Sequence, residues 1–183
     1  MLNTIKLIIV NKVMRDIKNT NYLYFLAGFV EGEGSISLSV TIHKDFKYGI
    51  NIQPVFNVTQ HKNGLNILNS FKELFNAGSV VQKSGSPDIY VYTLKGYKQI
   101  IHSVLPFFET YICPFSCKMD EYNIFKEVVL KSSEGKQRNK EDLIELVKLS
   151  YNLVGKGKIR SAKRDHYLKY LKLFKIKMLI LIN

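Results

Sequence analysis

What this 183-residue sequence has little of narrows its class. It contains no tryptophan and only two cysteines, Cys113 and Cys117, in a CxxxC spacing without an adjacent histidine. That spacing argues against a zinc module, and two cysteines are too few for the disulfide framework of a small secreted domain. We therefore expect reduced, partly buried thiols in an intracellular protein.

Long hydrophobic runs are also missing. Residues 1–15, MLNTIKLIIVNKVMR, have an apolar core too short to span a bilayer and lack a small-residue cleavage site. The segment from Leu173 to Ile182 is equally short and is interrupted by Lys175 and Lys177. We expect a docking or frayed helix end there rather than a membrane span. For residues 1–15, a weak amphipathic targeting segment is an alternative.

Acidic residues are scarce relative to basic ones. The chain has 27 Lys and Arg against 15 Asp and Glu, a net charge of +12, and residues 131–183 alone hold 14 basic and 5 acidic groups. This excess predicts a polyanionic partner, either nucleic acid or an anionic membrane surface. With 46% hydrophobic residues, a chain of this length can bury one core, so one domain is the default.

The string LAGFVEGEGS, residues 26–35, closes an apolar stretch that begins near residue 22. We expect a helix here, capped by Thr20 or Asn21 and ending near Gly32 or Gly34. Gly28 and Gly32 are four residues apart and so lie on one face of that helix. Because each glycine costs a helix about 1 kcal/mol relative to alanine, we expect this smooth face to receive a second backbone.

Two carboxylates, Glu31 and Glu33, follow at the carboxyl end of this helix. The helix macrodipole disfavours negative charge there unless a cation compensates it, and a divalent metal ion would do so. For an arbitrary EGEG string, a C-terminal glycine turn with two solvated glutamates is the alternative.

Beyond this string the hydrophobic period changes from helical to alternating. Residues 35–43 and 50–59 alternate apolar with short polar side chains, which predicts two half-buried strands, with Pro54 marking a bulge or a sheet edge. A helix over residues 62–75 and a hairpin turning at residues 85–88 follow, and further helices are expected from about Glu121 and from Asn139. The apolar residues of the first strand, expected on its core side, are Ile36, Leu38, Val40 and Ile42.

The other side of these strands carries hydroxyl, amide and cationic groups. Such groups can read base edges in the major groove, although an ordinary solvated face has the same composition. The candidate DNA-binding residues on the strands and turns are Ser37, Ser39, Thr41, His43, Lys47, Asn51, Gln53, Asn57, Thr59, Lys62, Lys83, Asp88 and Tyr90, with Tyr92 also expected to be exposed. A basic run near the carboxyl end predicts phosphate contacts, or alternatively a charged linker, at Lys156, Lys158, Arg160, Lys163 and Arg164.

The string LAGFVEGEGS resembles the signature of the LAGLIDADG homing endonucleases, which it matches at Leu26, Ala27, Gly28, Gly32 and Gly34. Glutamates stand where the family usually has aspartates. The resemblance implies an α+β fold with the order αββαββα, in which an antiparallel, saddle-shaped sheet with helices on one side straddles a DNA duplex. We accordingly expect an N-terminal extension (residues 1–20), an endonuclease domain (21–170) and a C-terminal tail (171–183).

The resemblance also implies roles for single residues. Glu33 matches the last acid of the motif and is implied as a ligand of the catalytic divalent metal, together with the backbone carbonyl of Gly32. Gln60 matches a position that orders water around the metals, and Lys118 matches the active-site lysine. Mg²⁺ is the implied cofactor, with Mn²⁺ expected to substitute. The residues implied at a dimer interface are Ala27, Gly28, Glu31 and Gly32.

The chain holds a single string of this kind. One acid per motif and one motif per chain predict a homodimer that cuts both strands of a long, nearly palindromic DNA site, because two-fold protein symmetry is mirrored in the site. The expected reaction is metal-dependent phosphodiester hydrolysis. The alternatives are an intron RNA maturase or a DNA-binding protein of this fold that does not cleave, and, less favoured, a membrane-surface protein. Family membership and an amino-acid bias typical of an AT-rich gene favour a mitochondrial or chloroplast origin.

Overall fold

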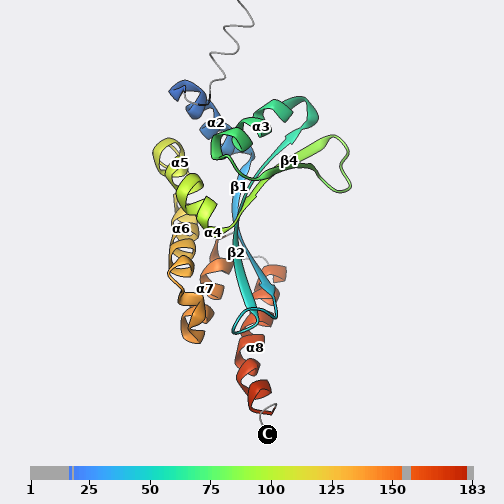
Figure 1. The fold of residues 1–183 in the computed structure, drawn as a ribbon, viewed down its shortest axis with the longest axis vertical. Helices are drawn as coiled ribbons and strands as arrows, with labels where there is room; N and C mark the ends of the chain where they lie inside the picture. The colour runs from blue at the N-terminus through green and yellow to red at the C-terminus, as the bar shows by residue number, and fades with distance from the viewer. Residues whose placement is uncertain (1–16, 18, 154–157, 181–183) are drawn as a thin grey trace, which may run out of the picture. The chain divides into compact units, whose positions relative to one another are not determined.

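The computed structural model combines helices with a four-stranded sheet in the order β1-β2-β4-β3 (Figure 1). It describes residues 17, 19–153 and 158–180, and only the backbone of residues 158–160 and 175–180. The first elements are α2 (Thr20–Glu33), β1 (Gly34–Ile42), β2 (Ile50–His61), η1 (Lys62–Gly64), α3 (Leu65–Phe75), β3 (Ser79–Gln82) and β4 (Ile89–Lys95). The helical elements that follow are α4 (Tyr97–Gln99), η2 (Ile100–Val104), α5 (Leu105–Phe107), η3 (Phe108–Ile112), α6 (Met119–Ser133), η4 (Lys136–Arg138), α7 (Lys140–Asn152) and α8 (Lys158–Ile180).

This order confirms the predicted α+β class and the αββαββα pattern. The helical stretch over residues 97–112 had no counterpart in the prediction. By its contacts the chain divides into two compact units, one formed by residues up to 35 and 56–117, the other by residues 36–55 and 118–183.

The N-cap of helix α2 is Asn19, which precedes both predicted caps, Thr20 and Asn21. The side chain of Asn19 accepts a hydrogen bond from the backbone N–H of Asn21 at 2.9 Å, so Asn19 is the cap, whereas Thr20 and Asn21 lie inside the helix. The helix ends where predicted, and Gly34 follows in an extended conformation. A Cβ atom at Gly34 would lie 2.6 Å from the carbonyl oxygen of Val30, so the chain can leave the helix this closely only with glycine.

The core of the first unit is aromatic. Phe56 of β2 makes edge-to-face contacts, with ring centroids 5.8 to 6.1 Å apart, with Phe71, Phe75, Tyr92 and Phe108. Tyr92 is fully buried and its hydroxyl donates a hydrogen bond to the carbonyl of Ala77 at 2.9 Å. The prediction that Tyr92 is exposed was therefore wrong, because its ring completes this cluster and its one polar group is satisfied inside it. Burial also raises the pKa of the Tyr92 hydroxyl.

Buried and exposed side chains alternate along strand β1 as predicted, except at its last residue. Leu38 and Val40 are buried, whereas Ser39 and Thr41 are exposed. Ile42 was expected in the core, yet its side chain is 47% exposed. It is the last residue of the strand and precedes the turn into β2, where the alternation of the strand ends.

For strand β2, the structure contradicts one of the two alternatives predicted at Pro54, the sheet edge. It runs unbroken from Ile50 to His61 and lies between β1 and β4, so it is not the edge strand that Pro54 was expected to mark. The side chain of Pro54 is buried, as are those of its neighbours Val55 and Phe56. Burial of this apolar stretch compensates for the ladder donor that proline lacks.

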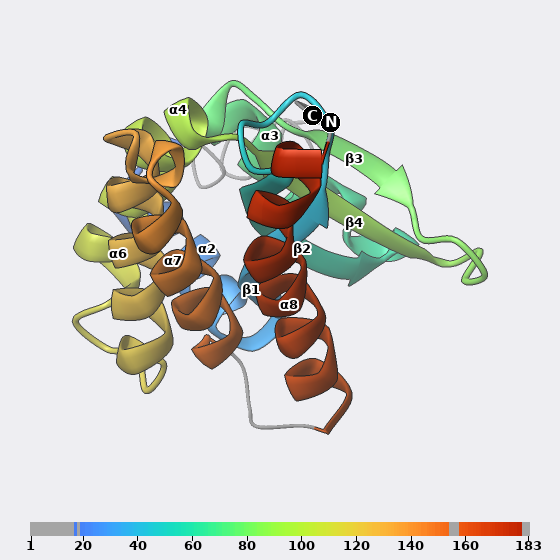
Figure 2. The same ribbon diagram turned by 90° about the horizontal axis from the view of Figure 1, so that it is seen from below.

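In the second unit α6 and α7 lie side by side (Figure 2), and α7 contacts α8. Asn139 caps α7, as predicted, by accepting hydrogen bonds from the N–H groups of Glu141 and Asp142 at 2.9 and 3.2 Å. Leu171 of α8 is fully buried, and the helix is continuous across the position where the tail was expected to begin. Among the described residues, no helix is long and apolar enough to cross a membrane.

Candidate active site

Glu33 is the last residue of α2, and its side chain is exposed. No hydrogen bond or ion pair joins its carboxylate to any residue that the structure describes. The last turn of α2 contains no basic residue either, so the negative charge at this end of the helix is not compensated within the described part of the chain. This carboxylate is available to a cation.

Glu31, two residues earlier, is half-buried and held by other side chains. Its Oε2 accepts a hydrogen bond from the hydroxyl of Ser116 at 2.8 Å, and its Oε1 accepts one from the thiol of Cys117 at 3.4 Å. Glu31 therefore fixes the segment that immediately precedes Lys118. Sequence reasoning missed Ser116 and Cys117, because residues 85 and 86 positions downstream carry no local pattern that would pair them with this carboxylate.

Gln60, near the end of β2, is half-buried and accepts a hydrogen bond through Oε1 from the backbone N–H of His61 at 2.7 Å. Gly64 leaves room for it: a Cβ atom at Gly64 would overlap the Cγ atom of Gln60. A larger residue at position 64 would displace the glutamine side chain. Glycine at position 64 thus allows the observed position of the Gln60 side chain, the candidate catalytic amide.

Lys118 is exposed and immediately precedes α6, where its carbonyl accepts a hydrogen bond from the N–H of Tyr122 at 3.0 Å. It belongs to the second unit, whereas Glu33 and Gln60 belong to the first. Both cysteines are thiols, as predicted, with Cys113 half-buried and Cys117 exposed.

The smooth face of α2 is open. A Cβ atom at Gly28 or at Gly32 would meet no atom within 4 Å, so packing within the chain does not require glycine at either position. Tyr24 and Phe25, one turn earlier, expose 44% and 50% of their surface. Ala27, assigned to the same interface, is only 3% exposed and faces the core of its own chain, so it offers a second chain almost no surface.

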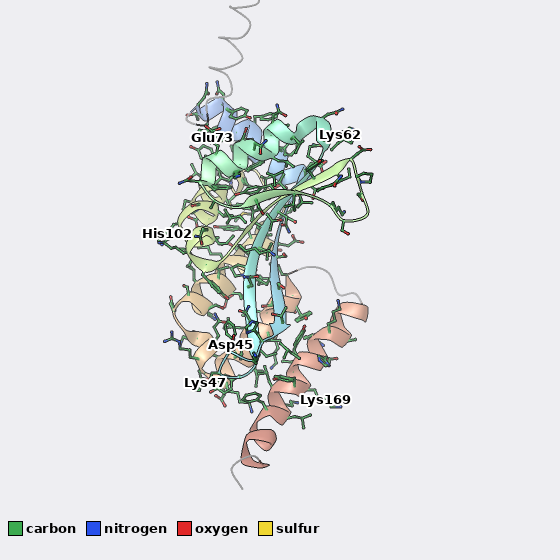
Figure 3. The ribbon with its side chains drawn as sticks, turned by 45° about the vertical axis from the view of Figure 1, so that its right-hand side comes forward. Asp45, Lys47, Lys62, Glu73, His102 and Lys169 are labelled. Carbon is green, nitrogen blue, oxygen red and sulfur yellow. The ribbon has the colours of Figure 1, made fainter. Side chains whose placement is uncertain are left out.

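The candidate DNA-binding residues of the first unit differ in their accessibility. Asn57 accepts a hydrogen bond from the hydroxyl of Thr93 at 2.8 Å, and Thr59 is half-buried. Lys62 and Asp88 neutralise each other in a 2.8 Å ion pair, while Lys83 is exposed (Figure 3 labels Lys62). Tyr90 is half-buried and, two residues from buried Tyr92, lies on the core-facing side of β4 rather than on the polar one.

In the second unit the candidates of β1 and the following turn are mostly exposed. Figure 3 shows Asp45 and Lys47 in that turn, where the Nζ atom of Lys47 donates to the carbonyl of Arg138 at 3.3 Å. Exposed candidates are Ser39, Thr41, His43 and Lys47, and half-buried ones are Ser37, Asn51 and Gln53.

The basic run near the carboxyl end is described in part. Lys163 of α8 is exposed, and Arg164 is half-buried and paired with Asp165 at 3.0 Å. Lys156 and the side chains of Lys158 and Arg160 lie outside the described residues.

One chain does not assemble a complete metal site within its described part. No group of three or more His, Cys, Asp or Glu side chains that could hold an ion occurs there. The donors that the motif does offer are the free carboxylate of Glu33 and the carbonyl of Gly32, which belongs to the last turn of α2 and therefore lacks a regular intrahelical donor.

A family model described as LAGLIDADG endonuclease matches residues 26–129, from the motif through most of α6. The chain belongs to the LAGLIDADG endonuclease family. Its sequence is 41% identical over 92 residues to the DNA endonuclease I-CeuI of Chlamydomonas moewusii, a match that spans 50% of this chain and 42% of that relative. It is 28% identical over 143 residues to the homing endonuclease I-ApeII of Aeropyrum pernix, spanning 77% of this chain and 83% of the relative.

Solved structures of this family have the same fold. The intron-encoded homing endonuclease I-CeuI complexed with DNA aligns with a TM-score of 0.71 and 30% identity, over 75% of this chain and 68% of that one. An archaeal intron-encoded homing endonuclease complexed with DNA aligns with a TM-score of 0.74 and 29% identity, over 84% of this chain and 96% of its own. The meganuclease I-SmaMI bound to DNA aligns with a TM-score of 0.68 and 26% identity, but this chain covers only 47% of it.

Proposed function

We propose that this LAGLIDADG chain acts as a homodimeric, site-specific DNA endonuclease that hydrolyses one phosphodiester on each strand of a long, nearly palindromic site. The observation that carries the proposal is the pair of glutamates in the motif. Glu31 is engaged by Ser116 and Cys117, whereas Glu33 ends the helix with a carboxylate that no described residue binds. The position that the family resemblance assigns to the metal is the one that the fold leaves free.

The donors present suit Mg²⁺. This ion is typically held by one or two carboxylates, further oxygen ligands and substrate phosphates, and Glu33 and the Gly32 carbonyl supply oxygen donors of these kinds. When bound, the ion polarises the phosphate and activates water. Glu33 and the Gly32 carbonyl would hold it, and Mn²⁺ is expected to substitute.

Two further residues complete the proposed chemistry. The side chain of Gln60 is pinned through Oε1 by the N–H of His61, which leaves its NH₂ group to orient a water molecule or a phosphate oxygen. Lys118 offers an exposed ammonium group that would stabilise negative charge developing on the scissile phosphate. The segment before Lys118 is fixed by Glu31, which makes Glu31 a positioning residue in this scheme.

A two-fold dimer through α2 is supported by the open glycine face. At Gly28 and Gly32 a Cβ atom would have no neighbour within 4 Å, and exposed Tyr24 and Phe25 extend the same apolar surface. A second α2 packed there would bury this surface and supply the second acid that cleavage of two strands requires. The aligned 77% of this chain covers 47% of I-SmaMI, so two copies of the aligned part correspond in length to about one such relative.

The polar strand residues and the net charge of +12 are proposed to grip DNA. For DNA, the most accessible contacts are Ser39, Thr41, His43, Lys47, Lys83 and Lys163. A mitochondrial or chloroplast gene is the proposed origin, and intron RNA is the alternative polyanion that the same basic surface would accept.

The decisive experiment uses the purified chain and duplex DNA carrying the intron insertion site, with and without Mg²⁺. We expect cleavage of both strands only with the metal, and Glu33→Gln to reduce the cleavage rate at least about a hundredfold while DNA affinity is kept. Cleavage by Glu33→Gln at the rate of the unmodified chain would refute the metal assignment.

A matched control is Glu73→Gln, the same change at an exposed position of α3 (labelled in Figure 3), which should leave cleavage unchanged. Tight binding of the intron RNA with no cleavage of the DNA site would favour the maturase instead.

A further inference from the structure

The β3–β4 hairpin exposes an apolar group on its polar side. Val81 of β3 lies directly opposite Val91 of β4 in the strand register and is 52% exposed, more than Ile42 at 47% or Leu173 at 43%. Val91 and Ile89 of the same side are half-buried. Directly opposed residues of an antiparallel pair touch, so Val81 and Val91 form one apolar patch, here called the valine pair.

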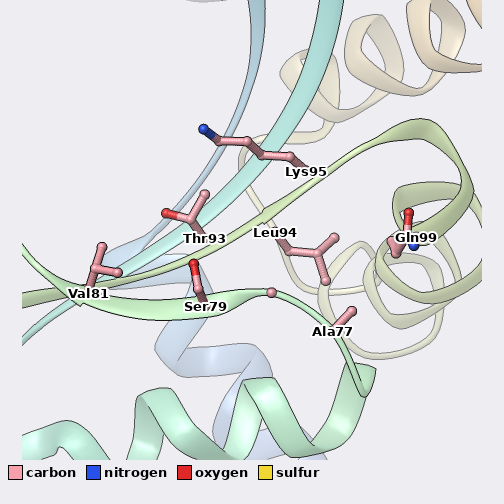
Figure 4. Close-up of a pocket in the computed structure, with 8 residues that line it drawn as sticks. Ala77, Ser79, Val81, Thr93, Leu94, Lys95 and Gln99 are labelled. Carbon is pink, nitrogen blue, oxygen red and sulfur yellow. The ribbon is translucent and has the colours of Figure 1, made fainter.

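The valine pair lies on the side of the hairpin that faces away from the core. Tyr92 and Leu94 alternate with Val91 along β4 and are buried, so Val91 and Thr93 point the other way. Thr93 is hydrogen-bonded to Asn57 of β2, which places the candidate DNA-binding residue Asn57 on this same side. Figure 4 shows Ser79, Val81 and Thr93 pointing to one side of the strands and Leu94 to the other.

The surroundings of the valine pair are polar and basic. Exposed Lys83 lies two residues beyond Val81 on the same side. An open hollow of about 420 Å³ beside Val81 is lined by the polar residues Ser79, Thr93, Lys95 and Gln99 and also by Ala77, Gly78 and Leu94. Val81 therefore keeps about half of its apolar surface open to an external group, between hydroxyl and ammonium groups of its own chain.

Base edges in the major groove offer one such group. Their hydrogen-bonding atoms are polar, and the C5-methyl of thymine is the apolar exception that side chains such as alanine contact. Lys83 and Lys95 would pair with the flanking phosphates, which fixes the hairpin in the groove without specifying sequence.

We propose that the valine pair reads the methyl group of thymine in each half of the DNA target and so selects thymine at one or two positions per half-site. This inference rests on the proposed binding of DNA by the strands and adds to it the identity of a recognised base. Val81 is the specificity-determining residue, with Val91 supporting it from the neighbouring strand.

The test begins by selecting binding sites from a randomised duplex library with the full chain. Each thymine that the selection fixes is then replaced by deoxyuridine, which keeps base pairing and removes only the methyl group. At one or two positions per half-site we expect the affinity to fall about fourfold, the factor for burying one methyl group. Val81→Ser should bind thymine and uracil duplexes equally.

The matched control is Ile42→Ser, the same kind of change at an exposed β-branched residue on the core-facing side of β1, which should keep the uracil penalty. The inference is overturned if no thymine is selected, if uracil is tolerated everywhere by the unmodified chain, or if Val81→Ser keeps the full penalty. Failure of the unmodified chain to bind any duplex would instead refute the proposed function.

Discussion

Glu31 and Glu33 stand two positions apart in α2, and a helix turns about 200° over that distance, so their side chains leave in different directions. One direction brings Glu31 to Ser116 and Cys117, and the other leaves Glu33 at the exposed end of the helix. Two identical side chains in one motif thus have different surroundings, because they leave the helix in different directions.

The contact between Glu31 and Ser116 predicts a measurable coupling in stability. Glu31→Gln and Ser116→Ala should each lower the free energy of unfolding by about 1 kcal/mol, because each weakens a charge-assisted hydrogen bond in a partly buried place. The double variant should lose less than the sum, with a coupling energy of at least about 0.5 kcal/mol in urea titrations. Strict additivity would show that the hydrogen bond contributes nothing.

Tyr92 predicts a loss of stability at alkaline pH. Burial raises the pKa of its hydroxyl above the usual tyrosine value near 10, so the folded chain keeps a proton that the unfolded chain releases. The contribution is complete below about pH 10 and is lost as the pH rises above it. Urea titrations between pH 8 and 11 should show a steeper fall for the unmodified chain than for Tyr92→Phe.

At neutral pH Tyr92→Phe should itself be less stable by about 1 kcal/mol, because the carbonyl of Ala77 loses its donor while the ring packing is kept. Equal alkaline slopes for the two proteins would rule out a buried, protonated Tyr92.

Among the elements, α2 shows how one helix serves two surfaces. Leu26, Ala27 and Val30 are buried in its own chain, whereas Gly28 and Gly32 form an open face. The same element is followed by Gly34, where a side chain would collide with Val30. Packing within the chain therefore requires glycine at position 34 but not at positions 28 and 32.

Because this face of α2 is open, a larger side chain there should prevent assembly of the proposed dimer without disturbing the fold of the chain. Gly28→Leu adds a side chain where no atom lies within 4 Å and should raise helix stability by up to about 0.8 kcal/mol. The same side chain would hold two α2 helices apart, so sedimentation should show a monomer in place of the dimer proposed for the unmodified chain. Asn69→Leu, at an exposed position of α3, should remain dimeric. A dimeric Gly28→Leu variant would place the interface elsewhere.

Across the whole molecule the excess of basic residues is expected to govern how the proposed DNA binding responds to salt. Each lysine that pairs with a phosphate releases counterions, so the affinity falls with salt more steeply as such contacts accumulate. Arg164 is paired with Asp165, and Lys62 is paired with Asp88. Lys163 is exposed, so we expect it to contact a phosphate more readily than Arg164 or Lys62.

Lys163→Gln should therefore flatten the plot of log affinity against log salt by about one unit while keeping the preferred sequence. Fluorescence anisotropy with the selected duplex between low and moderate salt measures this slope. Lys72→Gln, at an exposed position of α3, should leave the slope unchanged. An unchanged slope for Lys163→Gln would remove α8 from the DNA contact.

Much of the fold and part of the site could be read from the chain because the signals are local. The alternation of β1, the cap of α7 at Asn139 and the end of α2 at Gly34 each follow from neighbouring residues. Two predictions that failed, at Tyr92 and Ile42, concern residues whose environment is set by distant segments. Tyr92 looks like a polar strand residue until Phe56, Phe71 and Phe75 surround it.

The sequence by itself determined the family, through LAGFVEGEGS, as well as the order of helices and strands and the basic character of the chain. Only the tertiary structure gave Glu31 its partners Ser116 and Cys117, and only it placed Val81 opposite Val91 on the polar side of the hairpin. Local propensity depends on residues within a few positions, whereas the partner of a carboxylate or the exposure of a valine depends on segments brought together by folding.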